Sequence, residues 1–251
     1  AQTEFRIVSR SIKNPIIWNK ILTKGRRLVW LAAFFSILTP VLLVVPLRWF
    51  NPPITSFMLI RQIDAWRSSL DGFQIHYEWL YWNQISPELL LAVIAAEDQK
   101  YPYHHGFDTE SIQAALFKWQ ETGKLRGAST ITQQVAKNIY LWNGRSFVRK
   151  SLEAYFTMLL EIALDKKRIL ELYANIAEFG DGIYGAQAAA MRYFGMSARR
   201  LTRVQASRLA AVLPNPDKFH ADRPSRYVER RSRWIRAQMA QLGGILYLQE
   251  I

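Results

Sequence analysis

The sequence predicts a mostly α-helical protein with one N-terminal transmembrane helix. Residues 28–47 form an apolar run of twenty residues without a charge, long enough to cross a bilayer. Beyond this run the chain carries repeated helix-start and helix-stop signals and no convincing alternating strand pattern. We therefore expect a membrane helix followed by a domain built mainly from helices.

Residues 1–27 form a basic segment that precedes the apolar run. They contain seven Lys or Arg and a single acid, Glu4. Segments that flank a membrane helix on the cytoplasmic side are rich in cations. The sequence therefore predicts a cytoplasmic N-terminal tail, with the remaining ~200 residues on the other side of the membrane.

Residues 28–47 would measure about 30 Å as a helix, which is the thickness of the hydrocarbon core of a bilayer. A buried core helix is one alternative, but such helices usually keep a polar stripe, which this segment lacks. A cleaved signal peptide is the other. Its apolar region is usually shorter and ends in small residues, whereas Arg48, Trp49 and Phe50 follow here. We expect an uncleaved anchor.

Charge and cysteine content narrow the range of partners. The formal net charge of +13 favours nucleic acid, anionic lipid or a phosphorylated substrate. A domain outside the cytoplasm argues against nucleic acid and leaves lipid or lipid-linked phosphate. The absence of cysteine excludes disulfides and thiolate metal sites.

Residues 48–85 are interpreted as a linker and membrane-proximal segment, which opens with Asn51-Pro52-Pro53. The main domain is expected over 86–251. The stretch Ser86-Pro87-Glu88 predicts the start of its first helix, because it combines an N-cap candidate, a proline at the first helical position and an early acid.

Later helices carry similar signals. The run 147–173 is long enough for two helices separated near 165–167. Thr202 and Gln205 form a capping-box pattern, which predicts that a helix begins there. The other expected elements are a loop over 179–185, where three glycines occur, and a final, very basic helix over 225–242 closed by Gly243-Gly244.

Glu97 is the first candidate for chemistry. With Leu90, Val93 and Ile94 it falls on one helical face by i, i+3, i+4, i+7 spacing. A carboxylate at the end of an apolar face is partly desolvated, which raises its pKa and suits a general base. The alternative is a helix-terminal acid left in solvent.

Two other acidic or histidine-bearing patterns have ordinary explanations. Adjacent His104 and His105 could suggest a metal site, but neighbouring side chains diverge and no third ligand is evident, so zinc is not expected. Glu153 follows Arg149 by four residues and Lys150 by three, a spacing that by itself predicts only a surface ion pair.

A polar segment free of acids lies between these two glutamates. From Gly123 to Lys150 there are six Lys or Arg and not one Asp or Glu. Its polar helical side carries hydroxyl, amide and ammonium donors, contributed by Thr130, Gln134, Lys137 and Asn138. A solvated helix face usually includes acids, so this pattern favours a pyrophosphate site.

Four stretches of the sequence resemble, in order and spacing, the signatures of the peptidoglycan glycosyltransferases (glycosyltransferase family 51). They are Glu97-Asp98-x-x-Tyr101-x-x-His104-x-Gly106, then Gly127-Ala128-Ser129-Thr130-x-Thr132-Gln133-Gln134-x-x-Lys137-Asn138, then Arg149-Lys150-x-x-Glu153, and finally Ile169-Leu170-Glu171-x-Tyr173-x-Asn175. No transpeptidase domain follows in the sequence, so the resemblance is to the monofunctional, biosynthetic branch.

The resemblance implies a lysozyme-like, two-lobed α-helical domain with a small membrane-hugging lobe between the first and third signatures. It implies polymerisation of lipid II into glycan strands, with inversion at the anomeric carbon and release of undecaprenyl pyrophosphate. Glu97 and Glu153 would be the catalytic pair, Glu97 as the base and Glu153 as the orienter of a cation. The residues expected to bind substrate are Asp98, His104, Gly106, Ser129, Thr130, Gln133, Gln134, Lys137, Asn138, Arg145, Arg149, Lys150 and Asn175.

The same resemblance implies the surroundings of the reaction. No cofactor is expected to be required, and the assistance of a divalent cation is left open. The partners would be lipid II, the growing glycan strand, the membrane and divisome or elongation proteins. The catalytic domain would lie on the periplasmic or extracellular side of a bacterial inner membrane.

Two alternatives belong to different functional classes. A lytic transglycosylase would share the fold and a single catalytic glutamate, but it has no use for a pyrophosphate site. An envelope scaffold would use the anchor and the basic C-terminal helix to recruit partners, but it would not need intact Glu97 and Glu153.

Overall fold

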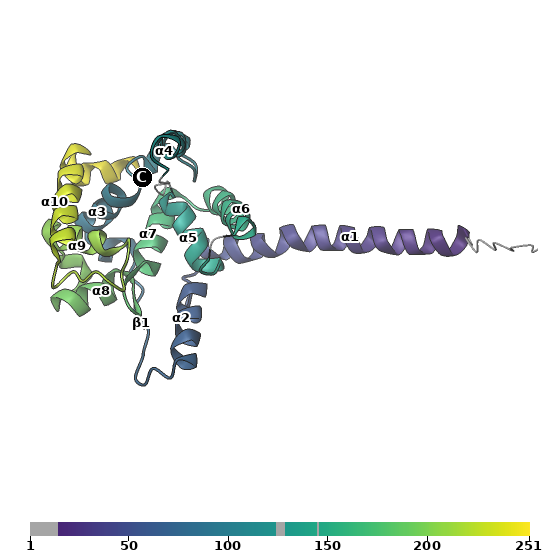
Figure 1. Ribbon diagram of the computed structural model, residues 1–251, viewed down its shortest axis with the longest axis horizontal. Coiled ribbons are helices and arrows are strands. Elements are labelled where there is room, and N and C mark those ends of the chain that lie inside the picture. Colours follow the sequence, from purple (N-terminus) through teal and green to yellow (C-terminus); the bar gives the residue numbers. More distant parts are fainter. Residues whose placement is uncertain (1–14, 124–128, 145) are drawn as a thin grey trace, which may run out of the picture. The chain divides into compact units, whose positions relative to one another are not determined.

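The computed structural model describes residues 15–123, 129–144 and 146–251 (Figure 1). The chain divides into two compact units, with the boundary between Leu43 and Val44. The first unit contains the long helix α1, and the second contains all the other elements.

Helix α1 runs from Pro15 to Val44, and the one-turn 3₁₀ helix η1 (Val45–Arg48) follows it. The stretch Gly25–Arg48 has a mean hydropathy of 2.5 with only 6% of its most apolar window buried, so it is long and apolar enough to cross a membrane. Helix α1 therefore includes the basic residues just before position 28 as well as the apolar run.

The second unit is mostly helical, as the sequence predicts. Its α-helices are α2 (Ser56–Arg67), α3 (Pro87–Glu97), α4 (Thr109–Thr122), α5 (Ile131–Tyr140), α6 (Phe147–Ala163), α7 (Lys166–Ile176), α8 (Gly185–Phe194), α9 (Arg203–Val212) and α10 (Arg226–Gln241). Short 3₁₀ helices connect them: η2 (Trp82–Gln84), η3 (Tyr101–Tyr103), η4 (Ala198–Arg200) and η5 (Gly244–Glu250).

Helix α3 lies beside α9 and α10 (Figure 1). Every residue from Leu89 to Ala95 is buried, because the helix is apolar on all sides. Helix α5 packs on α6 and α7 through the apolar side that contains Ile131 and Val135. The core thus fixes the C-terminal end of α3 beside the polar side of α5.

A small sheet corrects the expectation that the chain has no strands. It consists of β1 (His76–Tyr77), β2 (Glu178–Gly180) and β3 (Ile183–Tyr184) in the order β1-β3-β2. Strand β3 is parallel to β1 and antiparallel to β2. The prediction of a loop over 179–185 was therefore wrong, because strands of two or three residues are too short for alternation to be read.

Residues 48–85 contain the helix α2 and the sheet strand β1 in addition to the turn-forming prolines. Gly182 has a φ of +70° in the hairpin between β2 and β3, a value that favours glycine. The glycine pattern could therefore have predicted the hairpin of β2 and β3. It could not have predicted the pairing of β3 with β1, because β1 lies about a hundred residues earlier in the sequence.

The predicted helix boundaries are largely confirmed. Helices α6 and α7 are separated at Asp165, whose carboxylate caps α7. Thr202 and Gln205 form the capping box of α9, and α10 begins after the N-cap Ser225. Ser86 occupies the N-cap position of α3, but its hydroxyl donates to the carbonyl of Leu201 instead of capping the helix.

Candidate active site

Glu97 is the last residue of α3, and its side chain is 18% exposed. Its Oε2 accepts a hydrogen bond of 2.9 Å from Nε2 of Gln134, and Arg231 approaches its Oε1 to 3.8 Å. Burial raises the pKa of Glu97 despite these partners and nearby Lys137, which favour the charged form. The partly desolvated carboxylate that the sequence predicts is confirmed.

Gln134 is held at both ends of its amide. Its Oε1 accepts a hydrogen bond of 3.1 Å from the hydroxyl of Tyr173, while its Nε2 donates to Glu97. Tyr173 is only 1% exposed, so the phenol belongs to the core. The core therefore fixes Gln134, and Gln134 fixes the orientation of the Glu97 carboxylate.

Two hollows meet at Glu97. One, of about 870 Å³, contains Gln134 and Lys137 on the α5 side, and Tyr227, Arg230, Arg231 and Trp234 on the α10 side. The other, of about 570 Å³, lies on the α4 side of the carboxylate. Glu97 and Ser129 border both hollows. A carboxylate at such a junction can act between two ligands, one in each hollow.

Lys137 provides a cation in the larger hollow. Burial lowers its pKa, and the neighbouring Arg149 and Lys150 act in the same direction against the charges of Glu153 and Glu97. Its ammonium lies 5.2 Å from the centre of the Phe57 ring. A half-buried cation of this kind binds a phosphate oxygen more strongly than a fully hydrated lysine does, because less water is displaced.

Glu153 lies inside the protein and not at the surface. Its side chain is only 4% exposed, and it accepts hydrogen bonds from Arg149 at 2.8 Å and from Lys150. The ion pairs that the spacing predicts are present, but the prediction that Glu153 lies at the surface was wrong. A buried carboxylate that holds two cations can position both for an anionic ligand.

Asp98 connects the end of α3 to the start of α5. Its carboxylate accepts hydrogen bonds from the backbone N–H of Ile131 at 3.0 Å and from Nε2 of His104 at 2.8 Å. Both side chains are largely buried. Their contacts lie within the protein, and the substrate contacts predicted for them stay predictions.

Thr130 and Gly106 form a second connection. The hydroxyl of Thr130 donates to the carbonyl of Gly106 at 2.7 Å, and Thr130 forms the capping box of α5 with Gln133. Gly106 has a φ of +80°, and a Cβ there would lie 2.6 Å from Cγ2 of Thr157. Only glycine fits this position, which places the loop close to α5 and α6.

The remaining predicted residues are dispersed. Asn138 borders a smaller cavity together with Gln134 and Lys137. Asn175 is fully buried and forms two hydrogen bonds with the backbone of Leu80, so it holds the segment before η2. Arg145 lies outside the described residues.

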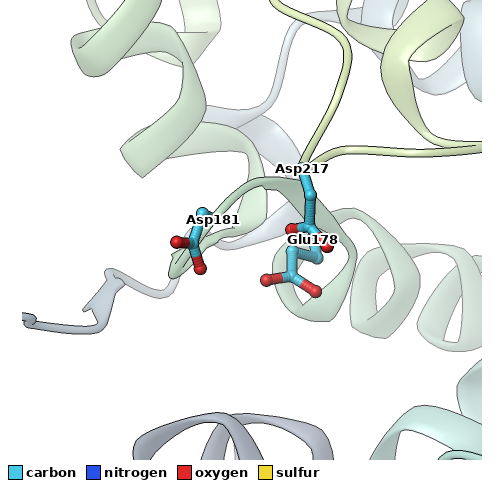
Figure 2. Close-up of side chains that lie close together, drawn as sticks. All are labelled: Glu178, Asp181 and Asp217. Atoms are coloured by element: carbon cyan, nitrogen blue, oxygen red, sulfur yellow. The ribbon is translucent and has the colours of Figure 1, made fainter. Parts of the chain in front are cut away.

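A group of three acids is the one cluster among the described residues with the geometry for a cation (Figure 2). Glu178, Asp181 and Asp217 each offer a carboxylate oxygen, and these atoms lie within 4.8 Å of one another. Burial raises the pKa of Glu178 to about 7. Asp181 already pairs with Arg61 at 2.6 Å, which offsets much of the negative charge that a cation would need.

A model of the transglycosylase family matches residues 67–240, which include every element from the end of α2 to α10. The chain belongs to this family. The match covers the junction of the two hollows and all the predicted site residues.

Curated relatives agree with the family match. The transglycosylase is 54% identical over 226 residues to a "Biosynthetic peptidoglycan transglycosylase" of Ectopseudomonas mendocina (strain ymp), a match that covers 90% of this chain and 93% of the relative. Proteins with the same name from Stutzerimonas stutzeri (strain A1501) and Xanthomonas campestris pv. campestris (strain B100) are 52% and 53% identical. These matches cover 93% and 83% of the chain, and 94% and 85% of the relatives.

Sequence reasoning missed two residues that complete the site of this transglycosylase. Arg231 donates to the carbonyl of Ala96 at 3.1 Å and faces Glu97. Tyr173 orients Gln134. Arg231 sits in a helix with many arginines, so composition could not single it out. Tyr173 was read as part of a signature, but its bond to Gln134 depends on the packing of α7 against α5.

Proposed function

We propose that this transglycosylase polymerises lipid II, an undecaprenyl-pyrophosphate-linked disaccharide, into glycan strands. The observation that carries the proposal is a desolvated carboxylate, Glu97, at the junction of two hollows and beside a half-buried cation, Lys137. The names of the relatives support the same reaction class.

Glu97 would act as the general base. The 4-hydroxyl of the acceptor sugar loses its proton to Glu97 as its oxygen attacks C1 of the donor sugar. The bond from C1 to the pyrophosphate oxygen breaks on the opposite side, so the configuration at C1 inverts. The raised pKa of Glu97 brings its basicity closer to the working pH, which is the condition for efficient proton transfer.

The cations of α6 would stabilise the leaving group, and the α5 cation Lys137 would hold the acceptor. Undecaprenyl pyrophosphate develops negative charge as the C1–O bond breaks, and ammonium and guanidinium groups stabilise it without a proton transfer. Lys137 would contact pyrophosphate on the acceptor side. Arg149 and Lys150, held by Glu153, would contact the donor pyrophosphate.

This arrangement supports synthesis rather than cleavage. A glycan-cleaving enzyme needs an acid that protonates the leaving sugar oxygen. The hollow that adjoins Glu97 contains the cations Lys137, Arg230 and Arg231, which have no role in cleavage of a neutral glycan. The word "biosynthetic" in the names of the relatives agrees.

The apolar helix supports a location at the bacterial inner membrane. It would anchor the chain as a single span, with the catalytic domain on the periplasmic or extracellular side, because seven cations precede position 28. Divisome or elongation proteins are further proposed partners. Transfer of a sugar from pyrophosphate to a hydroxyl needs no redox or group-carrying cofactor, and comparison of polymerisation with and without EDTA tests whether a divalent cation assists.

Incubation of the purified full chain with lipid II, with products separated on a gel, tests the proposal. Polymer of increasing length at the expense of lipid II is the expected result. Release of anhydro or reducing fragments from preformed glycan, with no consumption of lipid II, would identify a lytic enzyme instead.

A further inference from the structure

Helix α10 presents one face to the larger of the two hollows at Glu97. The residues of α10 that border this hollow are Tyr227, Arg230, Arg231 and Trp234. They follow one another at i, i+3, i+4 and i+7, which places them on a single side of the helix. A different set of α10 residues is buried in the domain, namely Val228, Ser232, Ile235 and Met239. The face toward the hollow is therefore free to bind a ligand.

Two large aromatic side chains on this face are only partly covered. Trp234 is 44% exposed, and Tyr227 is 40% exposed. Because apolar ring surface in water is unfavourable, a ligand that covers these rings gains binding free energy. Within the ranges that the structure describes, the indole N–H of Trp234 has no acceptor, and Arg230 forms no hydrogen bond or ion pair. The face thus combines open ring surface with unused hydrogen-bond donors.

Both aromatic side chains are held in place by neighbours. Tyr227 stacks on Phe219, with the ring centres 4.7 Å apart and the ring planes at 20°. The guanidinium of Arg231 lies 5.4 Å from the centre of the Trp234 ring and donates to the carbonyl of Ala96 at 3.1 Å. Side chains that are already ordered lose little conformational freedom when a ligand covers them.

The same hollow contains the two groups proposed to bind the two ends of the acceptor. Glu97 would take the proton of the acceptor's 4-hydroxyl, and Lys137 would contact its pyrophosphate; both border this hollow of about 870 Å³. The sugar of the acceptor must then lie between them, beside α10. Arg231 approaches Glu97 to 3.8 Å, so the Trp234 ring beneath Arg231 belongs to the end of the hollow where the hydroxyl reacts.

We propose that Trp234 and Tyr227 form a platform on which the acceptor's sugar ring stacks. The inference rests on the proposed function and adds to it a sugar subsite outside the four signature stretches. A pyranose ring with equatorial substituents has apolar faces made of C–H groups and a rim of polar groups. Stacking of such a face on an aromatic ring removes apolar surface of both partners from water, and the rim accepts hydrogen bonds from neighbouring donors such as Arg230.

The test separates the acceptor from the donor. The donor is lipid II with its 4-hydroxyl blocked, so that it cannot accept a sugar. The acceptor is the same lipid-linked disaccharide with a methylene group in place of the oxygen on C1, so that it has no leaving group. Each transfer then joins one donor to one acceptor, and the KM of each is measured separately on the full chain in detergent.

Trp234→Ala is expected to raise the KM of the acceptor about tenfold or more, with the KM of the donor unchanged and kcat within about threefold of the wild type. Trp234→Phe keeps a ring and should retain most of the acceptor affinity. Tyr227→Ala should raise the acceptor's KM by a smaller factor. Trp66→Ala is the matched control, because Trp66 is 70% exposed on α2 and borders neither hollow. Its loss should leave both KM values unchanged.

An unchanged acceptor KM after Trp234→Ala would overturn the platform, and a fall in kcat alone would show that the ring acts only through Arg231. An equal rise in the KM of donor and acceptor would also overturn it. If Trp234→Ala fails to fold, Trp234→Leu removes the aromatic ring but keeps apolar volume, and the same rise in the acceptor's KM is expected. If the wild type joined no donor to the acceptor and polymerised no lipid II, the proposed function would fail instead.

Discussion

Replacement of Gln134 by Glu would place a second carboxylate beside Glu97 with almost no change in shape. The hydrogen bond it replaces measures 2.9 Å. Two negative charges at that separation repel by about 6 kcal/mol at an effective dielectric constant of 20, which corresponds to about 4 pK units. The pair would therefore share one proton at neutral pH and titrate as a unit.

The shared proton makes the dyad a poor base. We expect Gln134→Glu to lower the polymerisation rate at pH 7 by about a hundredfold or more, since general-base assistance is worth 10²–10⁴-fold. The rate should recover as the pH rises and the second carboxyl ionises, until Lys137 loses its proton. Initial rates measured between pH 5 and about 10 would reveal this shift.

Gln134→Leu is the control, because it removes the hydrogen bond without adding a charge. It should lower the rate across the profile, with only a small upward shift of the acid limb. A wild-type pH profile for Gln134→Glu would refute the contact between Gln134 and the proposed base.

Three further predictions follow from the same site. In the wild type, the acid limb of the rate profile should lie above the pKa of an ordinary glutamate, because activity needs ionised Glu97 and burial raises its pKa; the alkaline limb should lie below that of an ordinary lysine, because burial lowers the pKa of Lys137. Lys137→Ala removes a charge-assisted contact worth about 1.5–3 kcal/mol, so activity should fall at least about tenfold, and an unchanged rate would remove Lys137 from the pyrophosphate site. Glu153→Gln should weaken both lipid II binding and turnover, because Arg149 and Lys150 lose the carboxylate that holds them; a pure rate defect with intact affinity would give Glu153 a chemical role instead.

The apolar N-terminal helix and the helical domain were readable from the sequence because both depend on local patterns. A run of twenty uncharged residues predicts a helix long enough to cross a membrane. Capping residues such as Thr202 and Asp165 mark where other helices begin. Glu97 was readable because it ends an apolar helical face, with Leu90, Val93 and Ile94 before it at helical spacing.

Other features depend on contacts between distant segments. Strand β1 pairs with β3 more than a hundred residues later, and neither strand is long enough to show a period. The burial of Glu153 cannot follow from its spacing to Arg149, since the same spacing occurs on exposed helices. The hydrogen bonds of Arg168 could not be predicted for the same reason, because their acceptors are backbone carbonyls about 120 residues earlier in the sequence.

The central claim is that Glu97 takes the acceptor's proton, and Glu97→Gln tests it most directly. Glutamine keeps the shape of the side chain and a hydrogen-bonding amide, but it cannot accept that proton near neutral pH. With initial polymerisation rate and lipid II affinity measured on the same preparation, turnover should fall by about 10²–10⁴-fold while affinity stays near that of the wild type. A near-normal rate for Glu97→Gln would contradict the account.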